Sequence, residues 1–109
     1  DQFLSGIATH SDRIKCIQEV YHSCGRFIDP HTAAGIKTAL DNNAGDVPVV
    51  CMETAKATKF EHTIEEALGV IPERPIAFKG LENKRQHFFD CEANAESVKK
   101  FIQNHLVKS

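Results

Sequence analysis

The residues best suited to chemistry lie where an apolar run passes into a polar turn, in the stretch VVCMETAKATKFEHTI at positions 49–64. A carboxylate, two hydroxyls and two ammonium groups gather in the turn: Glu53, Thr54, Lys56, Thr58 and Lys59. Ammonium groups bind phosphate as point charges, so the turn is a candidate site for an anionic ligand. A structural interpretation also stays open, in which Thr58 caps the following helix and both lysines are solvated.

A second candidate junction is FIDPHT, residues 27–32, where another extended segment leads into a helix. In open α/β sheets, ligands bind beyond the carboxyl ends of the strands, near helix N-termini whose free N–H groups favour anions. Asp29 is suited to cap such a helix, and Pro30 to occupy its first position. The alternative is that Asp29 is only a cap and His31 only a surface residue.

Helices must position both junctions, and apolar periodicity with capping residues predicts four of them. The expected N-caps are Ser11, Asp29 and Asn94, and the expected left-handed C-caps are Gly25 and Gly69. The predicted helices span residues 11–24, 31–43, 59–68 and 94–106.

The run VPVVCM, residues 47–52, predicts a strand buried on both faces, and residues 26–28 and 85–92 predict weaker extended segments. A turn cluster at 41–46 precedes the first of these, and residues 71–84 predict a turn or short helix with a loop. This order of elements favours an α/β fold, with helices around a small, mainly parallel sheet. One strong strand is too few for such a sheet, and the chain starts without methionine, so we expect a piece of a larger protein.

Composition limits the possible functions. The 109 residues suit one domain, and 41% hydrophobic with 26% charged content is ordinary for a globular protein. A formal net charge of -2 gives no electrostatic reason to expect nucleic acid or an anionic membrane as partner. No apolar stretch reaches the roughly 18 to 20 residues of a membrane-spanning helix, so a cytoplasmic protein is expected.

The four cysteines and six histidines do not form a metal or disulfide pattern. The chain has no C-x-x-C pair and no two histidines spaced i, i+4. Cys16, Cys24, Cys51 and Cys91 fall on predicted helices and strands, so we interpret them as buried reduced thiols. No metal site is expected.

Two longer strings carry a family resemblance. DPHTAAGIKTAL, residues 29–40, followed by ETAKATKFEHTIEEALG, residues 53–69, resembles the carboxy-terminal region of threonine synthase, most closely its microbial and fungal type. The resemblance covers nearly the whole chain. It implies part of a three-layer, fold-type-II enzyme that uses pyridoxal phosphate and converts O-phospho-L-homoserine and water to L-threonine and phosphate.

The resemblance also implies roles for individual residues. Thr54 matches the neutral hydroxyl that meets the pyridine nitrogen of the cofactor in this class, where a carboxylate would stabilise the protonated ring. Asp29, His31 and Thr32 match a turn that borders or supports the same pocket. Lys56 and Lys59 are weaker candidates as phosphate ligands. The family usually has His-Pro where this chain has Lys56-Ala57, which leaves the rigidity of the turn in question.

In this family, the lysine that holds the cofactor and the Gly-rich phosphate loop belong to earlier parts of the polypeptide. No G-x-G-x-x-G string occurs here. Residues 1–109 are therefore interpreted as a single carboxy-terminal α/β segment of a larger catalytic polypeptide, its partner being the rest of that chain. The segment has no catalytic residue of its own, and by itself it is expected to be inactive.

Two alternatives stay open. One is a fragment of a related fold-type-II lyase, such as a threonine dehydratase or cysteine synthase relative, although His31 after Pro30 and the T-A…K-F turn argue against it. The other is a free-standing small α/β binding or regulatory module. The length of the natural reading frame distinguishes the threonine synthase and lyase hypotheses from the module.

Overall fold

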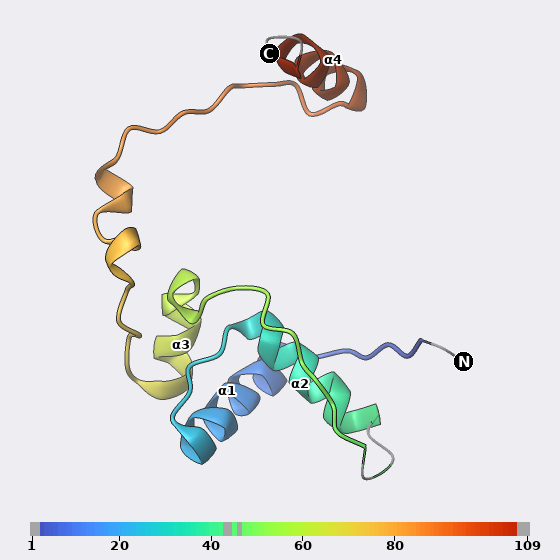
Figure 1. Ribbon diagram of the computed structural model, residues 1–109, viewed down its shortest axis with the longest axis vertical. Coiled ribbons are helices and arrows are strands. Elements are labelled where there is room, and N and C mark those ends of the chain that lie inside the picture. Colours follow the sequence, from blue (N-terminus) through green and yellow to red (C-terminus); the bar gives the residue numbers. More distant parts are fainter. Residues whose placement is uncertain (1–2, 43–44, 46, 107–109) are drawn as a thin grey trace. The chain divides into compact units, whose positions relative to one another are not determined.

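The regular structure of the chain is helical throughout the part described by the computed structural model, residues 3–42, 45 and 47–106 (Figure 1). The α-helices are α1 (His10–Cys24), α2 (Pro30–Asn42), α3 (Glu61–Leu68) and α4 (Ala95–Leu106). Short 3-10 helices are η1 (Ala57–Lys59), η2 (Ile76–Phe78) and η3 (Leu81–Asn83). The chain divides into two compact units, Asp1–Ile76 and Ala77–Ser109. In the described ranges, no helix has the length and apolar character needed to cross a membrane.

Helix α1 begins earlier than its sequence predicted. Thr9, not Ser11, is the N-cap: its hydroxyl accepts a hydrogen bond from the Asp12 backbone, and the Asp12 carboxylate accepts one from the Thr9 backbone at 2.8 Å. This reciprocal capping box satisfies two N–H groups, whereas Ser11 has no acidic residue three positions later. The predicted C-cap is confirmed, since Gly25 has φ 68° and its N–H donates to the Tyr21 carbonyl at 2.8 Å.

The other helices lie close to their predicted positions. Helix α2 starts with Pro30, and Asn43, the last residue of its predicted range, lies outside the described residues. The 59–68 helix has a 3-10 first turn, η1, before α3, and Gly69 closes it with φ 69°. Asn94 caps α4 by accepting a hydrogen bond from the Ser97 N–H at 2.8 Å. The short helices η2 and η3 confirm the prediction for residues 71–84.

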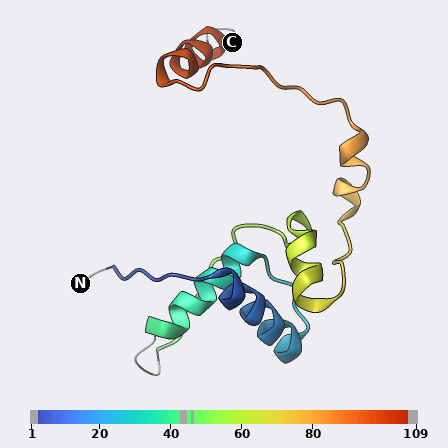
Figure 2. The same ribbon diagram turned by 180° about the vertical axis from the view of Figure 1, so that it is seen from behind.

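The hydrophobic core of the first unit forms where α1 packs against α2 and α3 (Figures 1 and 2). Ile17 of α1 and Ile64 of α3 are completely buried, and Ile28 is 3% exposed. The remaining buried apolar residues are small: Cys16, Ala33, Ala57 and Ala67. Small residues on α2 allow it to approach α1 closely, and they leave a core with few large side chains.

The predicted sheet is absent from the described residues. Residues 47–52 run as extended chain beside α2, and neither they nor residues 26–28 and 85–92 form a strand (Figures 1 and 2). The prediction of burial on both faces is wrong here, because Val47, Val50 and Met52 are 73, 83 and 75% exposed. A strand exists only where a neighbouring strand satisfies its backbone groups, and no other segment that the structure describes pairs with residues 47–52. Of the predicted turn before it, residues 43, 44 and 46 lie outside the described residues.

The cysteines are free in the structure, but the expected burial holds only for one of them. Cys16 is buried in the core, Cys51 is half-buried, and Cys24 and Cys91 are exposed. Cys24 lies at the last position of α1, where the stripe that faces the core has ended. Cys91 lies in the extended segment of the second unit, where Phe89 contacts Phe101 of α4 but Cys91 itself stays exposed.

Candidate functional site

The two junctions that the sequence selected lie side by side in the first unit. Arg26 Nη2 lies 2.7 Å from Glu53 Oε2, which joins the residue just before the 27–32 segment to the first residue of the other segment. The rings of His31 and Phe60 are in edge contact with centroids 5.0 Å apart, which joins their far ends. Residues 26–32 and 53–60 therefore form one candidate site.

Asp29 stabilises the first junction from the buried side. Its carboxylate is completely buried and accepts hydrogen bonds from the His31 backbone N–H and ring Nδ1, both at 2.9 Å, and from the Thr32 hydroxyl. Asp29 therefore caps α2 as predicted, and its bond to Nδ1 also orients the imidazole of His31. The His31 side chain is 63% exposed and lies at the surface of the candidate site, whereas Thr32 is buried.

The environment of Asp29 stabilises its charged form. Burial raises its pKa, but hydrogen bonds from the Thr32 hydroxyl and from the His31 backbone and ring outweigh that effect, so its pKa lies below the ordinary value of 3.8. A carboxyl with a lowered pKa in the folded state adds stability above its unfolded pKa, and this stability is lost as pH falls through the folded pKa.

Replacing Asp29 by alanine is expected to destabilise the fold by about 1–3 kcal/mol at neutral pH, because the cap is lost and the Thr32 hydroxyl is left without its acceptor. The difference between wild type and variant should shrink as pH falls below the ordinary pKa value of 3.8 and through the lower pKa of the folded state, where the wild-type carboxyl becomes protonated. Urea unfolding at several pH values measures both effects. Asp29→Asn is the control, since it keeps a capping oxygen but should remove the pH dependence. An Asp29→Ala penalty that stays constant at acid pH would contradict the role of the charge.

The second junction presents its polar groups to solvent. Thr54 is exposed, and its hydroxyl has no hydrogen-bond partner within the described ranges. Lys56 and Lys59 are also exposed, and Lys56 Nζ lies 3.7 Å from Glu53 Oε1. The Thr58 hydroxyl oxygen is buried without a partner in the same described part of the chain. Thr58 therefore does not cap the helix, so that part of the structural interpretation is wrong, whereas the exposure of both lysines agrees with it.

A groove of about 500 Å³ lies beside this junction. Its polar groups come from Arg26, Glu53, Lys56, Thr58 and Glu73, and its apolar walls come from Phe27, Ala57, Pro72 and Pro75. Sequence reasoning named Glu53 but missed Arg26. A signal was available, since the two residues carry opposite charges, one just before the 27–32 segment and one at the start of the other segment.

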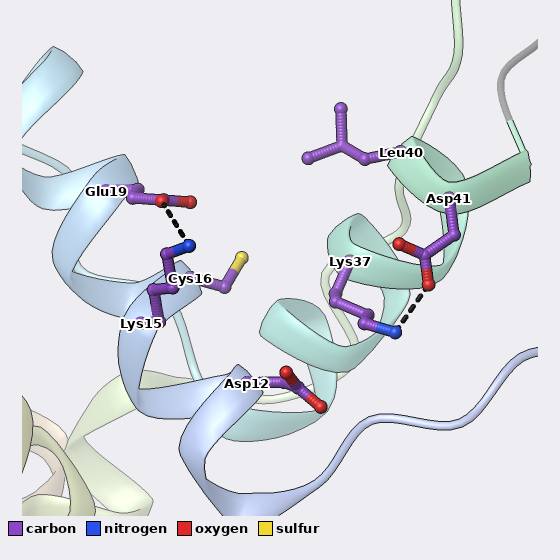
Figure 3. Close-up of a pocket in the computed structure, with 7 residues that line it drawn as sticks. All are labelled: Asp12, Lys15, Cys16, Glu19, Lys37, Leu40 and Asp41. Atoms are coloured by element: carbon purple, nitrogen blue, oxygen red, sulfur yellow. Dashed lines mark hydrogen bonds and ion pairs between the residues drawn. The ribbon is translucent and has the colours of Figure 1, made fainter.

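A second cavity, of about 190 Å³, lies between α1 and α2, and its lining residues come from these two helices alone (Figure 3). Its lysines are already paired: Lys15 lies 3.7 Å from Glu19, and Lys37 lies 2.5 Å from Asp41. Asp12 serves the capping box of α1. None of the predicted site residues lines this cavity. Across the described residues, no group of His, Cys, Asp or Glu side chains is placed to hold a metal ion.

Comparison with known families decides what these junctions belong to. A family model described as "Threonine synthase, C-terminal" matches residues 32–102, which is well over half of the chain. The chain belongs to this threonine synthase family. The match includes most of α2, the Thr54 turn, α3 and most of α4.

Sequence comparison with individual relatives gives the same family. The chain is 42% identical over 104 residues to threonine synthase of Methylobacillus glycogenes, covering 95% of this chain and 22% of the relative. It is 35% identical over 108 residues to threonine synthase of Corynebacterium glutamicum, covering 98% of this chain and 22% of the relative. The chain thus spans about a fifth of the length of these relatives.

A solved structure extends the likeness to three dimensions. The structure of PLP-bound threonine synthase from Brucella melitensis superposes with a TM-score of 0.71 and 28% identity, covering 92% of this chain and 22% of that one. The fold-type-II part of the fold prediction is thereby supported, although the sheet is not. The family match favours the threonine synthase hypothesis over a related lyase and over a free-standing module.

Proposed function

We propose that this chain is the carboxy-terminal part of an enzyme that converts O-phospho-L-homoserine and water to L-threonine and phosphate with pyridoxal phosphate. The single observation that carries the proposal is the threonine synthase family match across residues 32–102. The PLP-bound relative supports the choice of cofactor. The two units would both belong to one carboxy-terminal segment, and the rest of the polypeptide would be their partner.

The described residues suit the end of the cofactor that carries the pyridine nitrogen. Thr54 offers a neutral, exposed hydroxyl whose hydrogen-bonding capacity is unused among the described residues, which suits a pyridine nitrogen. The buried Thr58 oxygen nearby is also unpartnered there. Glu53 precedes Thr54, but its carboxylate is engaged by Arg26 and Lys56, so no free carboxylate of this turn competes for the ring.

Each site residue then has a physical task. When bound, the cofactor supplies an electron sink for charge that develops on the substrate. Thr54 would hold the ring by a hydrogen bond between neutral groups, which does not favour ring protonation as a carboxylate would. His31, oriented by Asp29, would border the pocket, with Thr32 supporting it. Lys56 and Lys59 would attract the phosphate of the substrate as exposed cations.

We also propose that residues 47–52 become a strand in the full-length polypeptide. Their β-branched, apolar side chains are exposed here, and their backbone has no partner strand within the described ranges. Most of the length of the relatives lies outside this chain, so the rest of the polypeptide could supply the neighbouring strands. Pairing would place Thr54 just beyond the carboxyl end of a strand, where ligands of α/β sheets bind.

The test is an assay of the full-length protein for phosphate release from O-phosphohomoserine. Release with formation of threonine is the expected result, and homoserine, which has no phosphate, is the control substrate. The 109-residue chain by itself is expected to release none. A purified full-length protein that binds the cofactor but leaves O-phosphohomoserine intact would contradict the proposed function.

A further inference from the structure

We infer that Arg26 and Glu53 act together as a positioning pair, which sets the path of the chain through Thr54 and thereby the placement of its hydroxyl. The inference rests on the proposed function, because it assigns a role within the same site. It adds two residues to which the sequence pattern gave no such role.

Glu53 is the last residue before Thr54, and its side chain is only 23% exposed. Its two carboxylate oxygens face two cations, with Oε2 2.7 Å from Arg26 Nη2 and Oε1 3.7 Å from Lys56 Nζ. The short, charge-assisted bond to Arg26 is the closer of these contacts, and it links residues 27 positions apart in the sequence. It therefore restrains tertiary structure, whereas the Lys56 contact is local.

The backbone of Arg26 lies between two well-fixed residues. Gly25 before it closes α1 in a left-handed conformation, and Ile28 after it is 3% exposed in the core. The ring of Phe27 packs against that of Tyr21 with centroids 4.8 Å apart. The backbone of Arg26 is thus fixed on both sides, and its side chain, which is 66% exposed, reaches Glu53 from this fixed point.

The turn that carries Thr54 needs such an anchor at its start. Its far end is secured, because Ala57 is 6% exposed and Phe60 contacts His31. At its near end, Val50 and Met52 are 83 and 75% exposed and provide little packing. Strand pairing would hold residues 47–52 in the full-length protein, but it would not determine the direction in which the chain leaves the strand. The ion pair of Glu53 does so directly before Thr54.

The pair also determines what Lys56 can do. Glu53 lies close enough to attract its ammonium group, and both residues line the groove beside the turn. Arg26 is the closer partner of Glu53, at 2.7 Å, so Lys56, at 3.7 Å, is the more weakly held of the two cations and the one that an anion could compete for. Without Arg26, Lys56 would be the only one of these two cations left to Glu53 and would pair with it more closely.

The test uses Arg26→Met, Glu53→Gln and the double variant in the full-length enzyme. Each single variant is expected to shift the absorbance of the bound cofactor and to lower kcat about tenfold, since a displaced group loses much of its effect while KM is little changed. The double variant should lose no more than either single variant, because both remove the same contact. Arg26→Lys should restore much of the wild-type spectrum.

Lys15→Met is the matched control, since it also removes one cation and breaks an ion pair, that with Glu19 on the surface of α1. It should leave spectrum and kcat unchanged. Wild-type spectra and rates in Arg26→Met and Glu53→Gln would overturn the inference. So would a double variant that loses about a hundredfold, the product of two independent effects.

The inference and the proposed function fail in different ways. If Thr54→Val alters the cofactor spectrum while the pair variants do not, the positioning role is wrong and the proposed site stands. If wild-type protein releases no phosphate from O-phosphohomoserine, the proposed function is wrong. Lower kcat in the pair variants with an unchanged spectrum and a lower Tm would show a merely structural role and would overturn the inference.

Discussion

Replacing Thr54 by valine in the full-length enzyme is expected to lower kcat roughly 10²-fold, a loss like that caused by removing one preorganised hydrogen-bonding group from an active site. Valine has nearly the shape of threonine but no hydroxyl, so the ring nitrogen of the cofactor would lose its partner. The absorbance of the bound cofactor should shift as well, because the hydrogen bond affects the electronic state of the ring. Steady-state kinetics and absorbance spectra measure both changes.

Thr54→Ser is the control for this experiment, since it keeps the hydroxyl and removes one methyl group. It should keep most of the wild-type rate and nearly the wild-type spectrum. The exposed position of Thr54 makes a folding defect an unexpected outcome for either variant. Identical spectra and rates in wild type and Thr54→Val would remove Thr54 from the cofactor site.

Replacing Ile64 by alanine is expected to destabilise the chain by about 2–5 kcal/mol, through lost apolar burial and the cavity that remains. Ile64 is completely buried where α3 packs on α1, and among the described residues only Ile17 and Ile28 are comparably buried large apolar residues of this core. The other buried apolar side chains are small and cannot fill the space. Urea unfolding of the 109-residue chain, followed by far-ultraviolet circular dichroism, measures the loss.

Ile71→Ala is the matched control, because it makes the same chemical change at a residue that is 57% exposed. Its effect should stay within about 0.5 kcal/mol, as for ordinary surface substitutions. Equal unfolding midpoints for Ile64→Ala and the wild-type chain would contradict the packing described here. The weaker packing of α3 in Ile64→Ala should also disturb the Thr54 turn, since η1 leads directly into this helix.

Local sequence signals determined the helices of this protein. Gly25 and Gly69 end α1 and α3 in left-handed conformations, and Pro30 and Asn94 mark the starts of α2 and α4. These signals succeed because a cap or helix end depends on groups within a few residues of each other. Ser11 failed as an N-cap for the same local reason, since Thr9 and Asp12 form the better reciprocal pair.

The apolar pattern of residues 47–52 led to the wrong secondary structure for this chain, because a strand depends on partners that need not be near it in sequence. The resemblance carried by residues 29–40 and 53–69 led to the threonine synthase family, since both strings are local. Tertiary structure decided what periodicity cannot encode: that Arg26 meets Glu53 and His31 meets Phe60. Those contacts arise only when α1, α2 and α3 pack around Ile17 and Ile64, and they bring the two junctions together beside Thr54.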